Sequence, residues 1–247
     1  MTENRLPRLC LVHALGADPD MWAPMRACLD YRGDILAPAQ YGIGGVPRHP
    51  APPTLGDHVD LLMTQIGAEG PVVLAGCAVG SLIAAEAAAR LGPRALGLVM
   101  ANPMLQVDAA ASAALTGRAE RALEGGIAAI EDEVISRGFA GLDLPEAVAS
   151  FRDGLHAMGA DVYADLAHGI CGADVTGAIR ALKCPLLLAP GGQDAVLPDW
   201  HLSKLRAMSR DARVEVIEPG GHFMPQQAPE AFAAALVPFL RQVAARR

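Results

Sequence analysis

Short apolar runs alternate with helix-like stretches along this chain of 247 residues. The runs cover residues 9–12, 35–37, 72–75, 96–100, 186–189 and 214–217, and the helix-like stretches cover 55–66, 81–91, 198–208 and 225–244. Continuous apolar runs of this length are typical of strands that are buried on both faces. Strands that alternate with helices predict an α/β fold with a mostly parallel, doubly wound sheet.

The alternation stops between the fourth and fifth apolar runs. Alanine-rich helical segments at 109–123 and 127–137 follow one another there without a convincing strand, and glycines at 125, 126, 138, 141, 154 and 159 divide the segment into short helices. We therefore expect one core made of residues 1–102 and 181–247, with residues 103–180 inserted as a helical cap.

Charge, apolar run length and cysteine spacing argue against nucleic-acid-binding, membrane-spanning and metal-binding proteins. The net charge is −7, with 20 basic and 27 acidic residues, and no run of like charges suggests a nucleic-acid surface. No apolar run approaches the roughly 18 residues that a membrane span needs. The five cysteines include no C-x-x-C pair, and no metal-ligand spacing is present. We expect a cytoplasmic protein that acts on a small molecule, without a metal, a cofactor, a nucleic-acid partner or a membrane partner.

A glycine-flanked segment, Gly76-Cys77-Ala78-Val79-Gly80, follows the third apolar run and precedes an alanine-rich helix. This arrangement indicates a nucleophile elbow, in which glycines allow a sharp turn from strand to helix. Cys77 is the predicted nucleophile, because a helix N-terminus favours the thiolate and lowers the pKa of a thiol. Ser81 lies in the first turn of the helix, where its hydroxyl more simply satisfies backbone groups.

An acid and a histidine follow the last two runs in the chain order of a hydrolase triad. Asp194 stands in Gly191-Gly192-Gln193-Asp194, and His222 follows Gly220-Gly221. Because the carboxyl ends of parallel strands meet in one crevice, Cys77, Asp194 and His222 are predicted to lie together. Asp199 is the competing acid, but its place after Pro198 suggests a helix cap.

These motifs together resemble the α/β-hydrolase superfamily, and specifically the 3-oxoadipate enol-lactonase group. Further matching segments are 12–18 with Met21-Trp22, 98–102, and 227–232. The family's usual nucleophile is serine, whereas a cysteine at the elbow resembles dienelactone hydrolases. The family's usual aspartate-arginine-glycine stretch after the second strand is replaced by residues 37–42.

The predicted reaction is hydrolysis of a small enol-lactone or related activated ester through an acyl-enzyme on Cys77. The resemblance implies a place in the breakdown of aromatic compounds. We expect the oxyanion to be held by the backbone N–H of Ala78 and, by resemblance, of Leu15. His13 is expected to stabilise a turn behind the oxyanion loop.

A carboxylated substrate needs a cation. The candidates in the cap are Arg118, Arg121, Arg137, Arg152, His156 and His168. From these we predict Arg118, Arg121 and His168 as substrate contacts, together with Trp22. Three alternatives stay open: a thioesterase or carboxylesterase, a non-catalytic small-molecule binding protein on the same fold, and, last, a metal-dependent hydrolase.

Overall fold

One parallel sheet organises the protein. The computed structural model describes residues 6–246, and its six strands lie in the order β2-β1-β3-β4-β5-β6. Their bounds are β1 Arg8–Val12, β2 Ile35–Leu36, β3 Val72–Cys77, β4 Ala95–Ala101, β5 Leu186–Ala189 and β6 Arg213–Val214. All five pairings are parallel, which confirms the predicted doubly wound α/β fold. The two edge strands are shorter than the apolar runs that predicted them.

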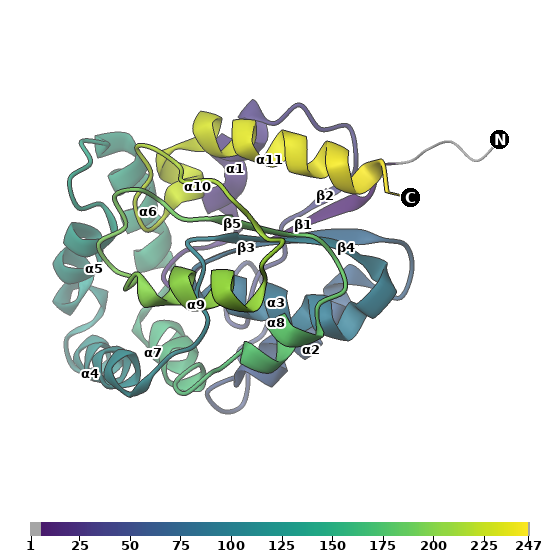
Figure 1. Cartoon of the computed structure of the whole chain (residues 1–247). Coiled ribbons are helices and arrows are strands. Elements are labelled where there is room, and N and C mark those ends of the chain that lie inside the picture. The colour runs from purple at the N-terminus through teal and green to yellow at the C-terminus, as the bar shows by residue number, and fades with distance from the viewer. Residues whose placement is uncertain (1–5, 247) are drawn as a thin grey trace.

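Helices cover both faces of the sheet (Figure 1). One face packs against α1 (Ala23–Cys28) and α11 (Pro229–Ala244), and the other packs against α2 (Leu55–Ile66), α3 (Val79–Leu91), α8 (Thr176–Ala181) and α9 (Trp200–Met208). Side chains alternate between these two layers along each central strand, so Ala75 faces α1 and α11 while Leu74 faces α3. The central strands are buried on both faces, as their apolar runs predict.

Local signals explain two helix boundaries. Thr54 and Asp57 form a reciprocal capping box that begins α2 at the predicted residue. The predicted helix over 225–244 is instead two helices, α10 (Met224–Gln227) and α11. They separate at Ala228, whose φ of −136° and ψ of 57° lie outside the helical region, because proline disfavours helix in the residue before it.

Of the α-helices between β4 and β5, the first four gather at one end of the sheet (Figure 1). They are α4 (Ala109–Gly125), α5 (Glu131–Gly138), α6 (Pro145–Met158) and α7 (Ala160–Gly169). We expect Gly154 from the sequence to end a helix, but it lies inside α6. Helix α8 falls within the expected cap segment, yet Ile179 packs in the core layer with α3. None of the helices among residues 6–246 combines the length and the apolar character that crossing a bilayer requires.

The loop after β2 holds the cap in place. Arg48 in this loop bonds to Asp165 of α7 at 2.6 Å, and a Cβ added to Gly42 would come within 2.8 Å of Val162. A Cβ added to Gly169, at the end of the same helix, would clash with the backbone of Pro53. The loop contains residues 37–42, where the sequence departs from the enol-lactonase pattern. In this protein the loop packs against α7.

Candidate active site

The turn from β3 into α3 centres on Ala78. Ala78 has φ 49° and ψ −115° and precedes the first residue of α3, and this backbone conformation is strained for any residue with a Cβ. A Cβ on Gly76 would lie 2.1 Å from the carbonyl oxygen of Gly80, and a Cβ on Gly80 would lie 2.3 Å from that of Val12. Both glycines are therefore required, and each is two residues from Ala78. In a G-x-S-x-G elbow the nucleophile occupies this central, strained position.

The prediction that Cys77 is the nucleophile is wrong in its register. Cys77 is the last residue of β3 and pairs with Ala101 in the sheet. Its side chain is fully buried in the core layer that also contains Val73 and Ala75. Its Sγ donates to the backbone carbonyl of His222 at 3.6 Å. Burial, and secondarily the charge of Asp194, raises the pKa of the Cys77 thiol well above its ordinary value, which is opposite to the predicted thiolate.

Asp194 and His222 do meet at the carboxyl ends of β5 and β6. Nδ1 of His222 lies 3.1 Å from Oδ2 of Asp194, and Asp194 also accepts from the N–H of Val196 at 2.8 Å and of Leu197 at 3.2 Å. Burial opposes the charged carboxylate, but the His222 ring and these donors lower the pKa of Asp194 overall. An ionised Asp194 fixes the proton on Nδ1, so Nε2 is the ring nitrogen free to act as a base.

Asp199, the competing acid, stands immediately before α9, but its side chain makes no capping hydrogen bond. The prediction that Asp199 caps this helix is therefore wrong. The preference for Asp194 depends instead on its contact with His222.

Asn102 ties the loops of this site together. Its amide donates to the carbonyls of Gly221 at 2.7 Å and His222 at 2.5 Å, and its oxygen accepts from the N–H of Gly191 at 2.6 Å. It follows β4 with φ 47°, a conformation that asparagine tolerates better than most residues. Asn102 therefore holds the loop after β5 and the loop that carries His222 in one arrangement.

A cavity of about 330 Å³ opens between His222 and the cap. Ala78 and Val79 line it from the elbow, Leu15 from the loop after β1, and His222 and Phe223 from the loop after β6. The remaining walls are mostly apolar and include Met104, Val107, Leu115, Val134, Leu197 and Trp200. Neither Cys77 nor Asp194 is part of this lining, so Ala78 is the residue that the elbow presents to a bound molecule.

Two residues of the cavity lining have backbone N–H groups without an acceptor in the described part of the chain. Leu15 and Val79 line the cavity, and neither N–H has an acceptor among the described residues. Val79 is the first residue of α3, where helical N–H groups lack an acceptor in the preceding turn. The N–H of Ala78, our predicted donor, is instead bonded to the carbonyl of Ala101 at 2.9 Å. Val79 is the residue after the centre of the elbow, which is the position whose N–H serves as an oxyanion donor in a nucleophile elbow.

Three arginines of the cap surround one carboxylate beside the cavity. Arg118 lines the cavity and bonds to Glu133 at 2.8 Å, while Arg121 bonds to the other oxygen of Glu133 from outside the lining. Burial opposes the charge on Glu133, but its bonds to Arg118 lower its pKa overall. Arg137 also lines the cavity, and its charge contributes to the lowered pKa of Glu133, but it forms no hydrogen bond or salt bridge with another described residue. The guanidinium donors of Arg137 thus remain open to an anionic ligand.

Two predicted substrate contacts do not reach the cavity. Trp22 is fully buried and packs against Phe232 with ring centroids 6.2 Å apart, so it is a core residue. His168 lies near the end of α7 outside the cavity lining, because that end of the helix packs against Pro53. With Arg121, these are three substrate contacts that the structure does not support.

Two supporting roles are confirmed. His13 lies 3.0 Å from the carbonyl of Ala14 through Nδ1 and accepts from the N–H of Gln40 through Nε2, so it stabilises the loop behind Leu15. Ser81 donates to the carbonyl of Ala78 at 2.6 Å and accepts from the N–H of Met104. Both side chains are fully buried and serve the backbone of the site.

His201 is a cavity residue that the sequence did not reveal. It lies in α9, and its Nδ1 accepts from the N–H of Leu105 at 3.1 Å, which leaves the ring proton on Nε2. Burial lowers the pKa of His201 to about 4, so this residue is neutral and can donate a hydrogen bond but not act as an acid at neutral pH.

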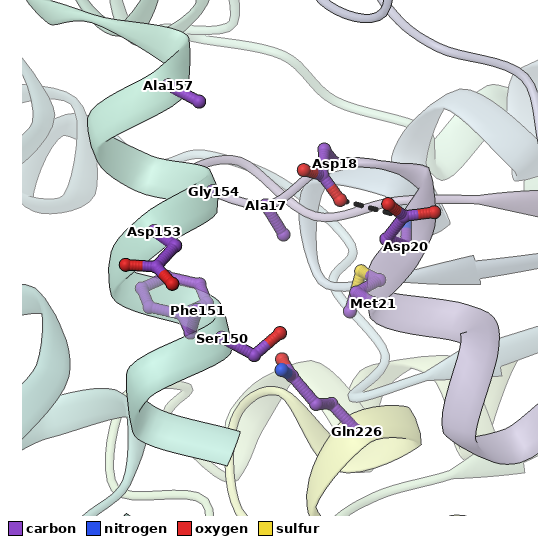
Figure 2. A pocket seen from close by; sticks show the side chains of 10 residues that line it. All are labelled: Ala17, Asp18, Asp20, Met21, Ser150, Phe151, Asp153, Gly154, Ala157 and Gln226. Carbon is purple, nitrogen blue, oxygen red and sulfur yellow. Dashed lines mark hydrogen bonds between the residues drawn. The ribbon is translucent and has the colours of Figure 1, made fainter. Parts of the chain in front are cut away.

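A second cleft, of about 390 Å³, lies between α6, α10 and the 3₁₀ turn Pro19–Trp22 (Figure 2). Asp18 and Asp20 stand on one side and Ser150 on the other, and the amide of Gln226 points toward Ser150. This cleft contains neither His222 nor a residue of the elbow. The His222–Asp194 pair and the N–H groups without a described acceptor lie at the cavity beside the elbow instead. Among residues 6–246, no cluster of three or more His, Cys, Asp or Glu side chains is arranged to hold a metal ion.

Comparison with known proteins agrees with this geometry. A family model described as the alpha/beta hydrolase family matches residues 11–235. The chain is 26% identical to a thermophilic esterase from Thermogutta terrifontis, solved with malate bound, with a TM-score of 0.86 over 97% of this chain and 91% of that one.

Two further similarities bear on the fold and on length. An enol-lactonase from Burkholderia xenovorans LB400 is 24% identical, with a TM-score of 0.82 over 98% and 94% of the two chains; at that identity the likeness shows the fold. The polyketide synthase ThaQ of Burkholderia thailandensis is 27% identical over 250 residues, which cover 96% of this chain. The chain spans only 12% of the length of that relative.

Proposed function

Because this chain belongs to the alpha/beta hydrolase family, we propose that it hydrolyses a small activated ester or enol-lactone with water that His222 activates directly. The observation that carries the proposal is the His222–Asp194 pair, 3.1 Å apart, in a cavity that also contains two free backbone N–H groups. A base and an oxyanion site are thereby present, while the central residue of the elbow, Ala78, has no nucleophilic atom.

The proposed reaction needs no acyl-enzyme. The substrate carbonyl oxygen accepts from the N–H groups of Leu15 and Val79, and a water molecule lies between Nε2 of His222 and the carbonyl carbon. Nε2 takes a proton from the water as its oxygen bonds to the carbonyl carbon, and the leaving oxygen receives that proton as the ester bond breaks. Asp194 stabilises the imidazolium formed between these two steps.

The missing nucleophile restricts the substrate class. Water activated by an imidazole is a weaker route than an acyl-enzyme, so the carbonyl must be reactive and the leaving group good. Aryl esters, thioesters and enol-lactones meet this condition, and unactivated amides do not. Arg137, which forms no hydrogen bond or salt bridge with a described residue although its charge acts on Glu133, favours a substrate that carries its own carboxylate.

Ala78 also favours a second candidate of a different class. A protein that retains the cavity but has a methyl group at the nucleophile position is suited to binding an acyl compound without turning it over. Under this alternative the His222–Asp194 pair acts as a hydrogen-bonding group for the ligand.

Turnover of matched substrates decides between the two functions. The wild type, His222→Gln and Cys77→Ala are assayed at neutral pH with a carboxylated enol-lactone, an aryl ester and an acyl thioester, with His168→Gln as a control outside the cavity. The proposal expects hydrolysis that His222→Gln removes and that the other two variants retain. Loss of activity in Cys77→Ala, with its fold intact by circular dichroism, would contradict it. Binding without turnover of any substrate would favour the binding protein.

The carboxylate preference has its own comparison. Arg137→Gln is expected to raise KM for a carboxylated aryl ester by about tenfold, since a hydrogen bond to a charged group is worth about 1.5 kcal/mol or more. KM for the uncharged ester should not change. The matched control is Arg152→Gln, because Arg152 bonds to Glu131 away from the cavity. An equal effect of both variants on both esters would remove Arg137 from the site.

A further inference from the structure

The side chain at the centre of the elbow ends at Cβ, although the base and the oxyanion donors of the site are in place. We propose that His222 also removes a proton from a carbon atom next to a ketone carbonyl, so that the cavity catalyses enolisation of small ketones and keto acids. This activity uses the same cavity as the proposed hydrolysis but does not depend on it, because a ketone has no bond for water to cleave.

The geometry favours direct contact between the base and the substrate. In an elbow that carries a nucleophile, the side-chain oxygen stands between the histidine and the bound carbonyl carbon. Here the side chain of Ala78, which lines the cavity, ends one atom short of that position. A carbonyl oxygen held by the N–H groups of Leu15 and Val79 therefore has its neighbouring carbon, rather than an enzyme atom, facing Nε2 of His222.

The proton and electron balance is simple. Nε2 of His222 takes the proton from the carbon, the C–H electron pair forms a C=C bond, and the carbonyl π pair moves to the oxygen as an enolate. The two N–H groups stabilise the enolate oxygen, and ionised Asp194 stabilises the imidazolium. Return of a proton to the carbon or to the oxygen gives back the ketone or the enol. No oxidant, reductant or further reactant is needed.

The surroundings suit this chemistry better than they suit a charged nucleophile. Val134, Leu197 and Phe223 line the cavity beside His222, and apolar walls strengthen the interaction of the enolate with its two donors. Among the described residues of the lining, Arg137 keeps its hydrogen-bond donors free of a salt bridge, which makes a keto acid the preferred form of the ketone.

Exchange of the hydrogen atoms next to the ketone for deuterium measures proton removal even when no product accumulates. The probes are 4-oxopentanoate, its methyl ester and cyclohexanone at 100 mM in D₂O near neutral pH, and proton NMR follows loss of the signals next to each ketone. The wild type is expected to exchange 4-oxopentanoate at least about tenfold faster than buffer, since a positioned general base contributes about 10² or more. His222→Gln should return the rate to that of buffer, and His168→Gln should leave it unchanged.

Ala78→Ser gives a test that a folding defect cannot imitate. A hydroxyl at this position stands between His222 and the ketone, so exchange should fall at least about fivefold while hydrolysis of an aryl ester rises. Opposite changes in two activities of one variant show that its fold is intact.

The outcomes are separable from those of the proposed function. Exchange with no ester hydrolysis would support this inference and contradict the hydrolase proposal, and the reverse would contradict the inference alone. Exchange no faster than buffer for all three probes overturns the inference. Exchange that survives both His222→Gln and Asp194→Asn overturns it as well.

Discussion

Removing the Asn102 amide should destabilise the protein and displace the catalytic histidine. In Asn102→Ala two buried groups, the N–H of Gly191 and the carbonyl of Gly221, lose their partner, while the partly buried carbonyl of His222 keeps only its weak bond from the Cys77 thiol. A buried polar group left without a hydrogen bond costs about 1 to 3 kcal/mol. At the low end of this range, two such groups cost about 2 kcal/mol. A domain is stable by only about 5 to 15 kcal/mol, so the effect is large.

Equilibrium urea unfolding followed by circular dichroism measures this loss. Gln65→Ala is the control, because it breaks one amide bond to the carbonyl of Ala39 at 2.9 Å that is only partly buried, and it should cost about 1 kcal/mol or less. A cost for Asn102→Ala no larger than that of Gln65→Ala would refute the reasoning. It would mean that the loops of Gly191 and His222 hold their positions without Asn102.

Asn102→Asp refines the same prediction through pH. The carboxylate keeps the bond from Gly191 but places its second oxygen against two carbonyls, so its pKa in the folded state is raised above the unfolded value. A raised folded pKa contributes stability that is present at low pH and lost as the pH rises. The variant should therefore approach the stability of the wild type as the pH falls from 7 to 5. A gap that widens on acidification would contradict the assigned contacts.

The remaining predictions concern a thiol, a buried ring and two glycines. Iodoacetamide should label Cys28, which is exposed, well before Cys77 in the native protein, and faster labelling of Cys77 by peptide mass spectrometry would contradict its burial. Both ring nitrogens of His58 are buried without a partner and burial lowers its pKa to about 4, so its contribution to stability falls by about 3 kcal/mol as the pH drops from 6.5 to 4. His58→Leu should therefore be at least as stable as the wild type at pH 7, with an advantage that grows on acidification in urea titrations; equal pH slopes would refute this. Gly80→Ala should lower the free energy of unfolding by about 3 kcal/mol, because the added Cβ would meet a backbone carbonyl at 2.3 Å. Gly177→Ala in α8 meets nothing within 4 Å and should raise the free energy of unfolding by up to about 1 kcal/mol. Similar unfolding midpoints for the two variants would contradict the tight packing of the elbow.

The sheet could be predicted because its signals are local. Each central strand is an apolar run, and the capping box at Thr54 begins α2 at the expected residue. The helices of the cap are less regular in their apolar pattern, so α6 and α7 had no prediction of their own. Gly154 shows that a glycine does not always end a helix, because it lies inside α6.

The acid and the base were predictable, whereas their partners were not. Asp194 and His222 follow strands whose ends converge, and chain order alone pairs them. Asn102 bonds to Gly221 across 119 residues and His201 to Leu105 across 96, so no local pattern reports either contact. The register of the elbow was available from sequence. Two glycines at 76 and 80 centre on residue 78, and the alternation along β3 turns Cys77 into the core.

The central claim is that Ala78, and not Cys77, occupies the nucleophile position. Intact-mass spectrometry after mixing with an activated aryl ester tests it most directly, with the wild type, Cys77→Ala and Ala78→Ser compared at the same time points. The account predicts no acyl adduct on residue 77 in the wild type and one acyl group on residue 78 in Ala78→Ser. An adduct that maps to Cys77 in the wild type and disappears in Cys77→Ala would contradict it.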